Sequence, residues 1–279
     1  MRRVPFRTIL ERIHELNGLT YDGANTSLLA VVVNSINRRV AEAWDWCPWP
    51  ELLRVEQRAF AEDWVATESY STGDVVWYNS AYWEAQQDST GVAPVEGADW
   101  SETDTPADKL IAWEQSGETK IGRPLYIYKN DPRSASTNVR YSWMEDTDGI
   151  HMLGCTRETV WVVFMEPATV YSSIVWATNA PYERYDVVYY PGTETGIAFP
   201  DKGECYKAEL DSAGEQFWQL QPFPAVLAAY VTYAAAADLA RYYRKDEDAA
   251  RLQADADDHL NQHAMRYAAQ TRMNVQVNQ

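Results

Sequence analysis

The residues best spaced for metal chemistry are His259 and His263, which lie four positions apart with Asp255 and Asp258 beside them. On a helix this spacing places both imidazoles on one face, an arrangement that can bind zinc. No Glu follows the first His, and no third ligand is evident. We therefore interpret the pair as part of a solvated helix face and predict no metal site.

Carboxylates, cysteines and enzyme motifs give no catalytic site either. Adjacent acids such as Glu145 and Asp146, or the run 246–248, are usual on an acidic surface, and the separation that a glycosidase needs cannot be read from sequence. Cys155 is expected to be buried or half-buried rather than a nucleophile. GxSxG, phosphate-loop and dinucleotide motifs do not occur, and GETKIG at 117–122 has its Thr and Lys in the wrong places. We predict no catalytic residue, no cofactor and no enzymatic activity.

The composition is rich in aromatic and acidic residues. The chain of 279 residues has 12 Trp and 18 Tyr, which suit either an aromatic β core or an interface. Its 41 Asp and Glu against 24 Lys and Arg give a formal charge of −17. This balance disfavours a protein that wraps DNA, because phosphate contacts need Lys and Arg. It is compatible with simple solubility or with a surface that DNA slides past.

Cysteine spacing and hydropathy add further exclusions. Cys47, Cys155 and Cys205 are scattered and indicate neither a disulfide framework nor a zinc site. The N-terminus begins with basic residues, but charges interrupt its apolar run, so we do not expect a signal peptide. No uninterrupted apolar stretch reaches about 18 residues, and we predict no membrane contact.

Two helices are expected in the first fifty residues. Over 6–16 apolar residues recur every three or four positions, and Asn17-Gly18 ends the pattern. Thr26 or Ser27 is expected to cap a second helix, which stops before the prolines of CPWPEL.

The pattern then changes twice. From about 53 to 222, short β-branched and aromatic runs separated by turn residues indicate strands. From Pro224 an alanine-rich segment, the charged run RKDED and another apolar-periodic segment predict a helical hairpin or one long kinked helix. The tail 271–279 has no strong pattern.

These elements predict an α+β fold. The N- and C-terminal helices are expected to pack into one helical bundle, with small antiparallel β modules inserted between them, because each helical end alone would leave an apolar stripe uncovered. The expected parts are 1–60 with 223–279 as the bundle, 61–106 as a first small β module, 107–180 as a β-rich middle segment, and 181–222 as a second, divergent β module.

The β region contains an imperfect repeat, with copies at 70–102 and 182–220. A unit of about 40 residues buries little surface, so large aromatic side chains are expected to fill its core. The matched residues are Asp74–Val76 with Asp186–Val188, Tyr78 with Tyr190, Tyr82 with Tyr206, Ala85 with Ala208, and Trp100 with Trp218.

The first copy, with YSTGDVVWYNSAYWEAQ and a later Trp, resembles a chitin-binding type 3 module over roughly 64–102. In that family exposed aromatic rings stack on the apolar faces of sugars. The resemblance implies glycan-stacking candidates at Trp77, Trp83 and Trp100, with Tyr82 in the core of the motif. The second copy departs from the pattern, because Tyr185 replaces the motif Gly and the hairpin is longer.

The helical ends resemble a second family. VNSINRRVAEAWDWCPWPEL, at 33–52, is similar to the N-terminal signature of head-to-tail connector (adaptor, or head-completion) proteins of tailed bacteriophages, in which an Asn-Arg-Arg helix runs into a Trp-rich, Pro-closed turn. The alanine-rich helical pair and IGRPLYIYKNDPR also resemble that family. The interface or core candidates implied are Asn37, Arg38, Arg39, Trp44, Trp46 and Trp49.

The connector resemblance implies a structural virion protein that is assembled in the host cytoplasm and located at the head–tail junction. Such proteins form homo-oligomeric rings, usually of twelve subunits, that dock under the portal protein, contact tail or nozzle proteins and continue the channel. DNA passes through that channel without specific binding. The alternative is a glycan-binding adhesin or an accessory carbohydrate-binding protein. The two are compatible, because a ring of weak glycan modules gains avidity.

Overall fold

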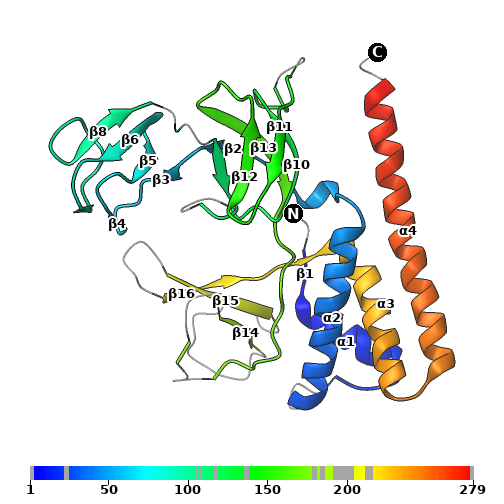
Figure 1. Cartoon of the computed structure of the whole chain (residues 1–279). Coiled ribbons are helices and arrows are strands. Elements are labelled where there is room, and N and C mark those ends of the chain that lie inside the picture. The colour runs from blue at the N-terminus through cyan, green and yellow to red at the C-terminus, as the bar shows by residue number, and fades with distance from the viewer. Residues whose placement is uncertain are drawn as a thin grey trace. The chain divides into compact units, whose positions relative to one another are not determined.

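The structure is a computed structural model of the chain and combines helices with small sheets (Figure 1), so the predicted α+β class is confirmed. Contacts divide the chain into two compact units, unit 1 (1–52 with 168–279) and unit 2 (53–167). The structure describes residues 3–21, 25–104, 106, 109–115, 119–134, 138–177, 181–182, 186–190, 204–210 and 216–276, with no side chains given for 209–210, 216–217 and 266–276.

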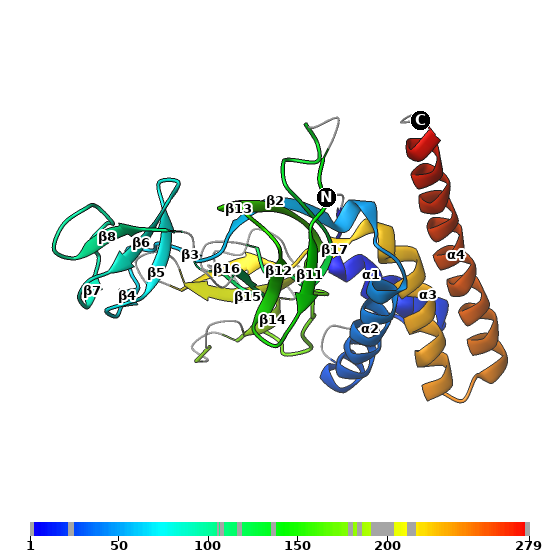
Figure 2. The ribbon, with the colours of Figure 1, turned by 45° about the horizontal axis from the view of Figure 1, so that its top comes forward.

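Unit 1 contains the helices, because its two segments carry both helical ends of the sequence. α3 contacts each of the other three helices, and α2, α3 and α4 run side by side in Figures 1 and 2. The alanines of the second half of α3 (Ala234–Ala237 and Ala240) are buried, so neighbouring backbones can approach the helix closely there. The helices are α1 (Phe6–Leu16), α2 (Thr26–Trp46), α3 (Ala225–Tyr242) and α4 (Asp246–Gln276).

The start and end of the first two helices follow local capping chemistry. α1 ends at Asn17-Gly18 as predicted: Gly18 has a φ of 71° and its amide donates to the Glu15 carbonyl at 2.9 Å. The predicted cap of α2 is wrong, since Thr26 and Ser27 are its first helical residues. The cap is Asn25, whose side chain accepts from the Leu28 amide at 3.1 Å.

α3 and α4 form a hairpin, which settles the two alternatives left by the sequence. Arg244, in the turn, has a φ of 58° and its amide donates to the Arg241 carbonyl at 2.9 Å. The Lys245 amide donates to the Ala240 carbonyl, also at 2.9 Å. This is the Schellman pattern of helix ends, with Arg244 where glycine is usual.

Unit 1 also holds a three-stranded antiparallel sheet in the order β14-β15-β16. Its Glu204 is buried and accepts from the amide of Phe6, the first residue of α1, at 2.9 Å. A carboxylate at a helix N-terminus satisfies an unpaired amide and the helix dipole, which α1 cannot do itself because Pro5 precedes it. The strands of unit 1 are β1 (Arg3–Val4), which pairs with β17 (Phe223–Pro224), and β14 (Val187–Tyr190), β15 (Glu204–Leu210) and β16 (Gln216–Leu220).

Unit 2 begins where the predicted helical part was expected to continue. Residues 53–60 were assigned to that part, but β2 (Leu53–Ala59) pairs along its whole length with β13 (Thr159–Met165). Two prolines have already ended α2, so the amides of this segment find partners in a sheet. The expected middle segment also divides, since residues from 168 onward belong to unit 1.

Two three-stranded sheets in unit 2 share one apolar core, which includes Ile111 and Ile150 from one sheet and Ile127 and Val162 from the other. The sheet orders are β10-β13-β2 and β11-β12-β9. The additional strands are β9 (Leu110–Ala112), β10 (Arg123–Tyr128), β11 (Ser142–Glu145) and β12 (Gly149–Leu153).

The first repeat copy forms a separate four-stranded sheet in unit 2, in the order β3-β5-β6-β8, with a small β4-β7 pair beside it. Its own core consists of Tyr70, Val76, Ala85 and Trp100. Aromatic rings supply most of this small core, as expected for a module of this size. The strands are β3 (Glu62–Asp63), β4 (Ser69–Tyr70), β5 (Val75–Tyr78), β6 (Ala81–Ala85), β7 (Ser89–Thr90) and β8 (Trp100–Thr103).

Candidate functional site

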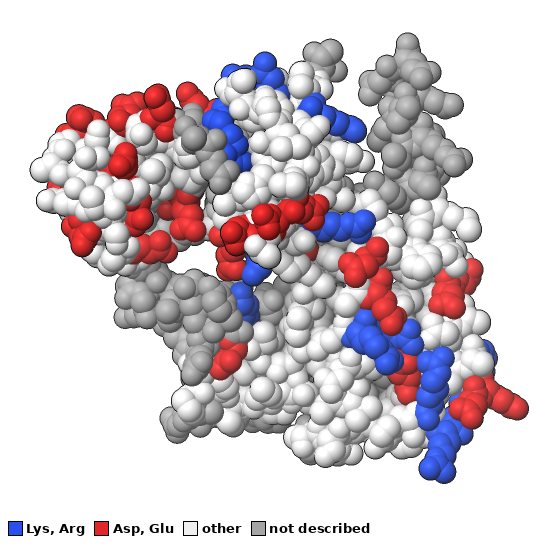
Figure 3. Space-filling view, viewed as in Figure 1, with Lys and Arg blue, Asp and Glu red and all other residues white. Residues whose placement is uncertain are grey.

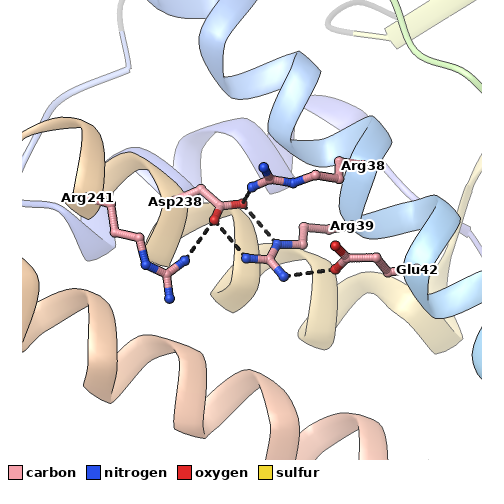
Figure 4. A pocket seen from close by; sticks show the side chains of 5 residues that line it. All are labelled: Arg38, Arg39, Glu42, Asp238 and Arg241. Atoms are coloured by element: carbon pink, nitrogen blue, oxygen red, sulfur yellow. Dashed lines mark hydrogen bonds and ion pairs between the residues drawn. The ribbon is translucent and has the colours of Figure 1, made fainter.

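Among the described residues of unit 1, the carboxylate of Asp238 on α3 has an unusually large number of polar partners (Figure 4). It accepts from the Ser35 hydroxyl at 2.5 Å and pairs with Arg38 at 2.5 Å and Arg241 at 2.9 Å. Arg39 binds it with two nitrogens, at 2.9 Å and 2.7 Å. Asp238 is the single acidic residue of an apolar, alanine-rich helix, so its environment is set by these α2 and α3 donors.

Arg39 carries the same network to α4. Its remaining donors reach Glu42 at 2.8 Å and the Gln253 side chain at 3.1 Å. The side chains of Arg39 and Asp238 are each only 12% exposed. A planar guanidinium with this many oriented partners fixes α2, α3 and α4 relative to one another.

The ionisation of the pair follows from its surroundings. Burial alone would raise the pKa of Asp238, but hydrogen bonds from Arg39, Ser35 and Arg38 outweigh it and lower that pKa to about 2. The hydrogen bonds that Arg39 donates to Asp238 raise the pKa of Arg39 above its ordinary value, against the opposing effect of burial. Both groups are therefore charged at neutral pH.

This arrangement suits binding better than catalysis. A shallow pocket is lined by Arg38, Arg39, Glu42, Asp238 and Arg241, three cations against two anions. Asp238 is a poor general base near neutral pH because its pKa is low and its oxygens accept four donor groups. Arg38 and Arg241 are 58% and 46% exposed, so their outer donors face solvent and can meet a carboxylate or phosphate.

Asn37 links α2 to the β part of unit 1. Its side-chain amide donates to the Tyr171 carbonyl at 2.8 Å, and its oxygen accepts from the Tyr171 amide at 2.8 Å. The Asn37 side chain thus forms the two hydrogen bonds that the backbone of a neighbouring strand would form with Tyr171. The Tyr171 ring stacks on Phe6 at 4.8 Å, so Asn37 positions the aromatic core under α1.

The three tryptophans at the C-terminal end of α2 (Trp44 and Trp46) and directly after it (Trp49) separate into two kinds. Trp44 and Trp49 are buried, and the Trp49 indole donates to the Ala43 carbonyl at 2.7 Å. Trp46 is 55% exposed. Trp44 and Trp49 therefore belong to the core, and Trp46 alone is available to a partner.

The structure corrects two of the four glycan-stacking candidates, Tyr82 and Trp100, because both rings are buried. Trp100 is 0% exposed and Tyr82 is 3% exposed, so neither ring can meet a sugar. The Trp100 indole donates to the Val92 carbonyl at 2.9 Å. The Tyr82 hydroxyl accepts from the Phe60 amide at 2.9 Å and donates to the Glu158 carbonyl, which joins the module to the rest of unit 2.

Trp77 and Trp83, the remaining candidates, do not lie on one face. Trp77 pairs with Tyr82 across β5 and β6, whereas Trp83 pairs with Val76. Cross-strand partners share a face and successive residues alternate, so the two indoles point to opposite sides of the sheet. Both are half-buried, Trp77 against the larger core of unit 2 and Trp83 against the module's own core. The four residues form no flat platform for sugar rings.

The internal repeat is present in the structure, with one correction. The β5-β6-β8 and β14-β15-β16 sheets have the same strand order, and Ala85 pairs with Trp100 as Ala208 pairs with Trp218. Val76 pairs with Trp83 and Val188 with Tyr206. Tyr206 is thus equivalent to Trp83, not to Tyr82 as the sequence match had it, because the longer second hairpin allowed a shift of one residue.

The repeat also extends beyond the matched sequences. The Trp64 amide donates to the Trp77 carbonyl at 3.0 Å, and the Trp176 amide to the Tyr189 carbonyl at 2.9 Å. The hydroxyls of Tyr70 and Tyr182 each accept from the amide five residues earlier, at 2.7 Å and 2.8 Å. Unit 1 and unit 2 therefore each contain one copy of the same small fold.

The two histidines contact different aromatic rings. The His259 ring stacks on Tyr233 with 5.2 Å between ring centres, and the His263 ring meets the Trp49 ring edge-on with 6.4 Å between ring centres. Within the described residues, no group of three or more His, Cys, Asp and Glu could hold a metal ion. Cys155 is buried, as expected. Burial raises the pKa of the Cys205 thiol to about 12, so it is protonated at neutral pH.

Sequence reasoning missed Asp238, Tyr171 and Glu204. The visible signal for Asp238 was one carboxylate inside the run AAAADLA, where an acid needs a partner. No helix in the described part of the chain is long and apolar enough to cross a bilayer. Comparison of the chain with family models, with curated proteins and with solved structures found no match.

Proposed function

We propose that the chain is a structural virion protein of a tailed bacteriophage, a connector subunit that assembles into a ring between the portal and the tail. In this proposal α1 to α4 form the helical bundle that builds the ring, and the two β modules are inserted into it. The observation that carries the proposal is that the N- and C-terminal helices share one unit, fixed by Asp238 and Arg39, while Trp46 at the end of α2, in the connector-like segment, is exposed.

The exposed side of this unit supports an assembly role. Trp46 and Met265 are large apolar side chains at 55% and 71% exposure. They flank Trp49 and His263, which are in contact, so both belong to the same end of unit 1. Trp and Met are enriched in protein interfaces, and exposed rings of this size are costly in water unless a partner covers them.

The length of α4 supports docking to a larger partner. At about 1.5 Å per residue, its 31 residues span about 46 Å, against about 27 Å for the 18 residues of α3. Among its described side chains, which end at Met265, the buried apolar ones are Ala249, Leu252, Ala256 and Leu260. We assign the distal half, which extends beyond α3 in Figures 1 and 2, to the portal contact.

Electron microscopy of the purified chain, alone and mixed with its portal protein, tests the proposal. The expected images are closed rings, or portal particles with an added ring of density below them. Separate small particles in both samples, with no change in the portal images, would contradict it.

A further inference from the structure

The charges of unit 2 are segregated along the chain. Residues 59–108, which include the first module, contain eleven Asp and Glu and no Lys, Arg or His. Residues 120–140 contain five Lys and Arg and one Asp. In Figure 3 the module, at the left, shows red side chains across its visible face and no blue ones.

The module cannot neutralise this charge itself. Some of its carboxylates have local structural roles, as Asp74 accepts from the Ser71 amide at 2.7 Å and Asp88 from the Thr72 amide at 3.0 Å. Others, such as Glu102 and Asp104, are exposed. Like charges at this density repel one another, so a cationic surface placed against them would be strongly attracted.

A cationic surface is formed where Lys129, Arg133 and Arg140, from the segment between β10 and β11, lie beside the aromatic rings of β10 and β13. The Arg140 guanidinium lies 4.3 Å from the centre of the Tyr126 ring and 5.4 Å from that of Tyr128, and Tyr126 is 43% exposed. Arg133 lies 5.3 Å from the centre of the Trp161 ring. Tyr128 and Trp161 are cross-strand partners, so these rings share one face.

The arginines of this face are held in place before any partner binds. Stacking on a ring orients a guanidinium and leaves its edge donors for carboxylates, which reduces the entropy lost on binding. Arg133 is further fixed by Asp131, with a contact of 2.8 Å. Arg140 and the exposed Lys129 form no ion pair within the described residues, so their charge is available.

We propose that this Arg–aromatic face binds the acidic module of a second copy of the chain. The inference rests on the proposed ring and names the head-to-tail contact that would close it, since such a contact joins two different surfaces of each subunit. In the described part of the chain Lys129, Arg133 and Arg140 form no ion pair with the module of the same chain, which Tyr82 holds at Phe60 and Glu158. A nucleic acid is the less suitable occupant, because the neighbouring module and the formal charge of −17 both repel phosphate.

Charge reversal tests the contact. One variant carries Lys129→Glu with Arg140→Glu, and the other Glu102→Lys with Asp104→Lys. The control is Arg157→Glu, an exposed cation of unit 2 that belongs neither to the module, nor to the Arg–aromatic face, nor to the helices. Ring formation with the portal is measured by sedimentation velocity over a range of salt concentrations. Each double variant is expected to lose at least about tenfold in assembly affinity, and the control is expected to match the wild type.

Recombining the variants makes the test specific. In a head-to-tail ring the two double variants can alternate, reversed face against reversed module, so their mixture is expected to assemble again. Wild-type assembly by both double variants at all salt concentrations would overturn the inference and leave the proposed ring standing. A wild-type chain that never assembles would overturn both. Capture of a single-stranded oligonucleotide by the wild type, lost in Arg140→Glu without effect on assembly, would assign the face to nucleic acid instead.

Discussion

The Asp238 carboxylate illustrates how one residue can stabilise several elements. Replacing it with Asn keeps its shape but removes the buried counter-charge of Arg39, which is 12% exposed and keeps only the more exposed Glu42 as a carboxylate partner. We expect Asp238→Asn to lower the free energy of unfolding of the helical unit by about 3 kcal/mol, measured by urea titration with helical circular dichroism. Glu11→Gln, which breaks an exposed pair with Arg7, is the control and should cost less than about 0.5 kcal/mol. Equal effects of the two changes would contradict this assignment.

The same residue predicts a pH dependence. The pKa of Asp238 is about 2 in the folded chain and about 3.9 in an unfolded one. A depressed carboxyl pKa stabilises the fold above the unfolded value, and this contribution, about 2 kcal/mol, is lost as pH falls from about 4 to about 2. The stability difference between wild type and Asp238→Asn should therefore shrink over that range. A difference that stays constant down to pH about 2 would show that Asp238 is not ion-paired.

The tryptophans at and after the C-terminal end of α2 should respond in opposite ways. Trp44→Ala and Trp49→Ala remove buried rings and are expected to cost about 3–5 kcal/mol each in thermal or urea unfolding. Trp46→Ala should cost less than about 1 kcal/mol and instead weaken assembly with the portal. A large loss of stability for Trp46→Ala would show that this ring belongs to the core and would remove Trp46 as a proposed contact for assembly.

Residue roles were only partly predictable from the sequence. The connector resemblance directed attention to Asn37 and Arg39, but their partners Tyr171 and Asp238 lie 134 and 199 positions away. Such pairs depend on how helices pack and leave no local pattern. Tyr82 and Trp100 were misjudged because burial in a small module depends on which face is covered, and the sequence does not show what covers it.

Helix ends provide a test at the scale of elements. Gly18 and Arg244 occupy equivalent left-handed positions after α1 and α3, with φ of 71° and 58°. A Cβ at Gly18 would meet no atom within 4 Å, so only backbone strain opposes it. We expect Gly18→Ala to destabilise the chain by about 1 kcal/mol and Arg244→Gly to stabilise it by about 0.5–1 kcal/mol in urea unfolding. The same sign for both changes would contradict the shared geometry.

The elements themselves were the most predictable level. Apolar spacing gave α1 its observed bounds, and prolines gave the end of α2, because these signals are local. The cap of α2 was placed one or two residues late. Asn25, Thr26 and Ser27 are all good N-cap residues, and the sequence does not show which of them precedes the first helical residue. The repeat was found, but its register was shifted by one residue at Tyr206, where the hairpins differ in length.

At the scale of the whole molecule, the sequence indicated that helical ends enclose a β region, and the structure places both ends in one unit. The sequence did not indicate that residues 53–59 belong to unit 2, because predicting a strand does not identify the strand with which it pairs. Each unit received one copy of the repeated module. The module is fixed to its unit by buried polar contacts, at Tyr82 in one copy and Glu204 in the other.

The solution mass of the purified chain, determined by light scattering alone and with its portal protein, tests the proposed connector role most directly. We expect either a closed oligomer of about twelve subunits or a monomer that joins the portal in a fixed ratio, because the proposal has a partner cover the exposed Trp46 and Met265. A chain that stays monomeric and leaves the mass of the portal unchanged would contradict the proposal.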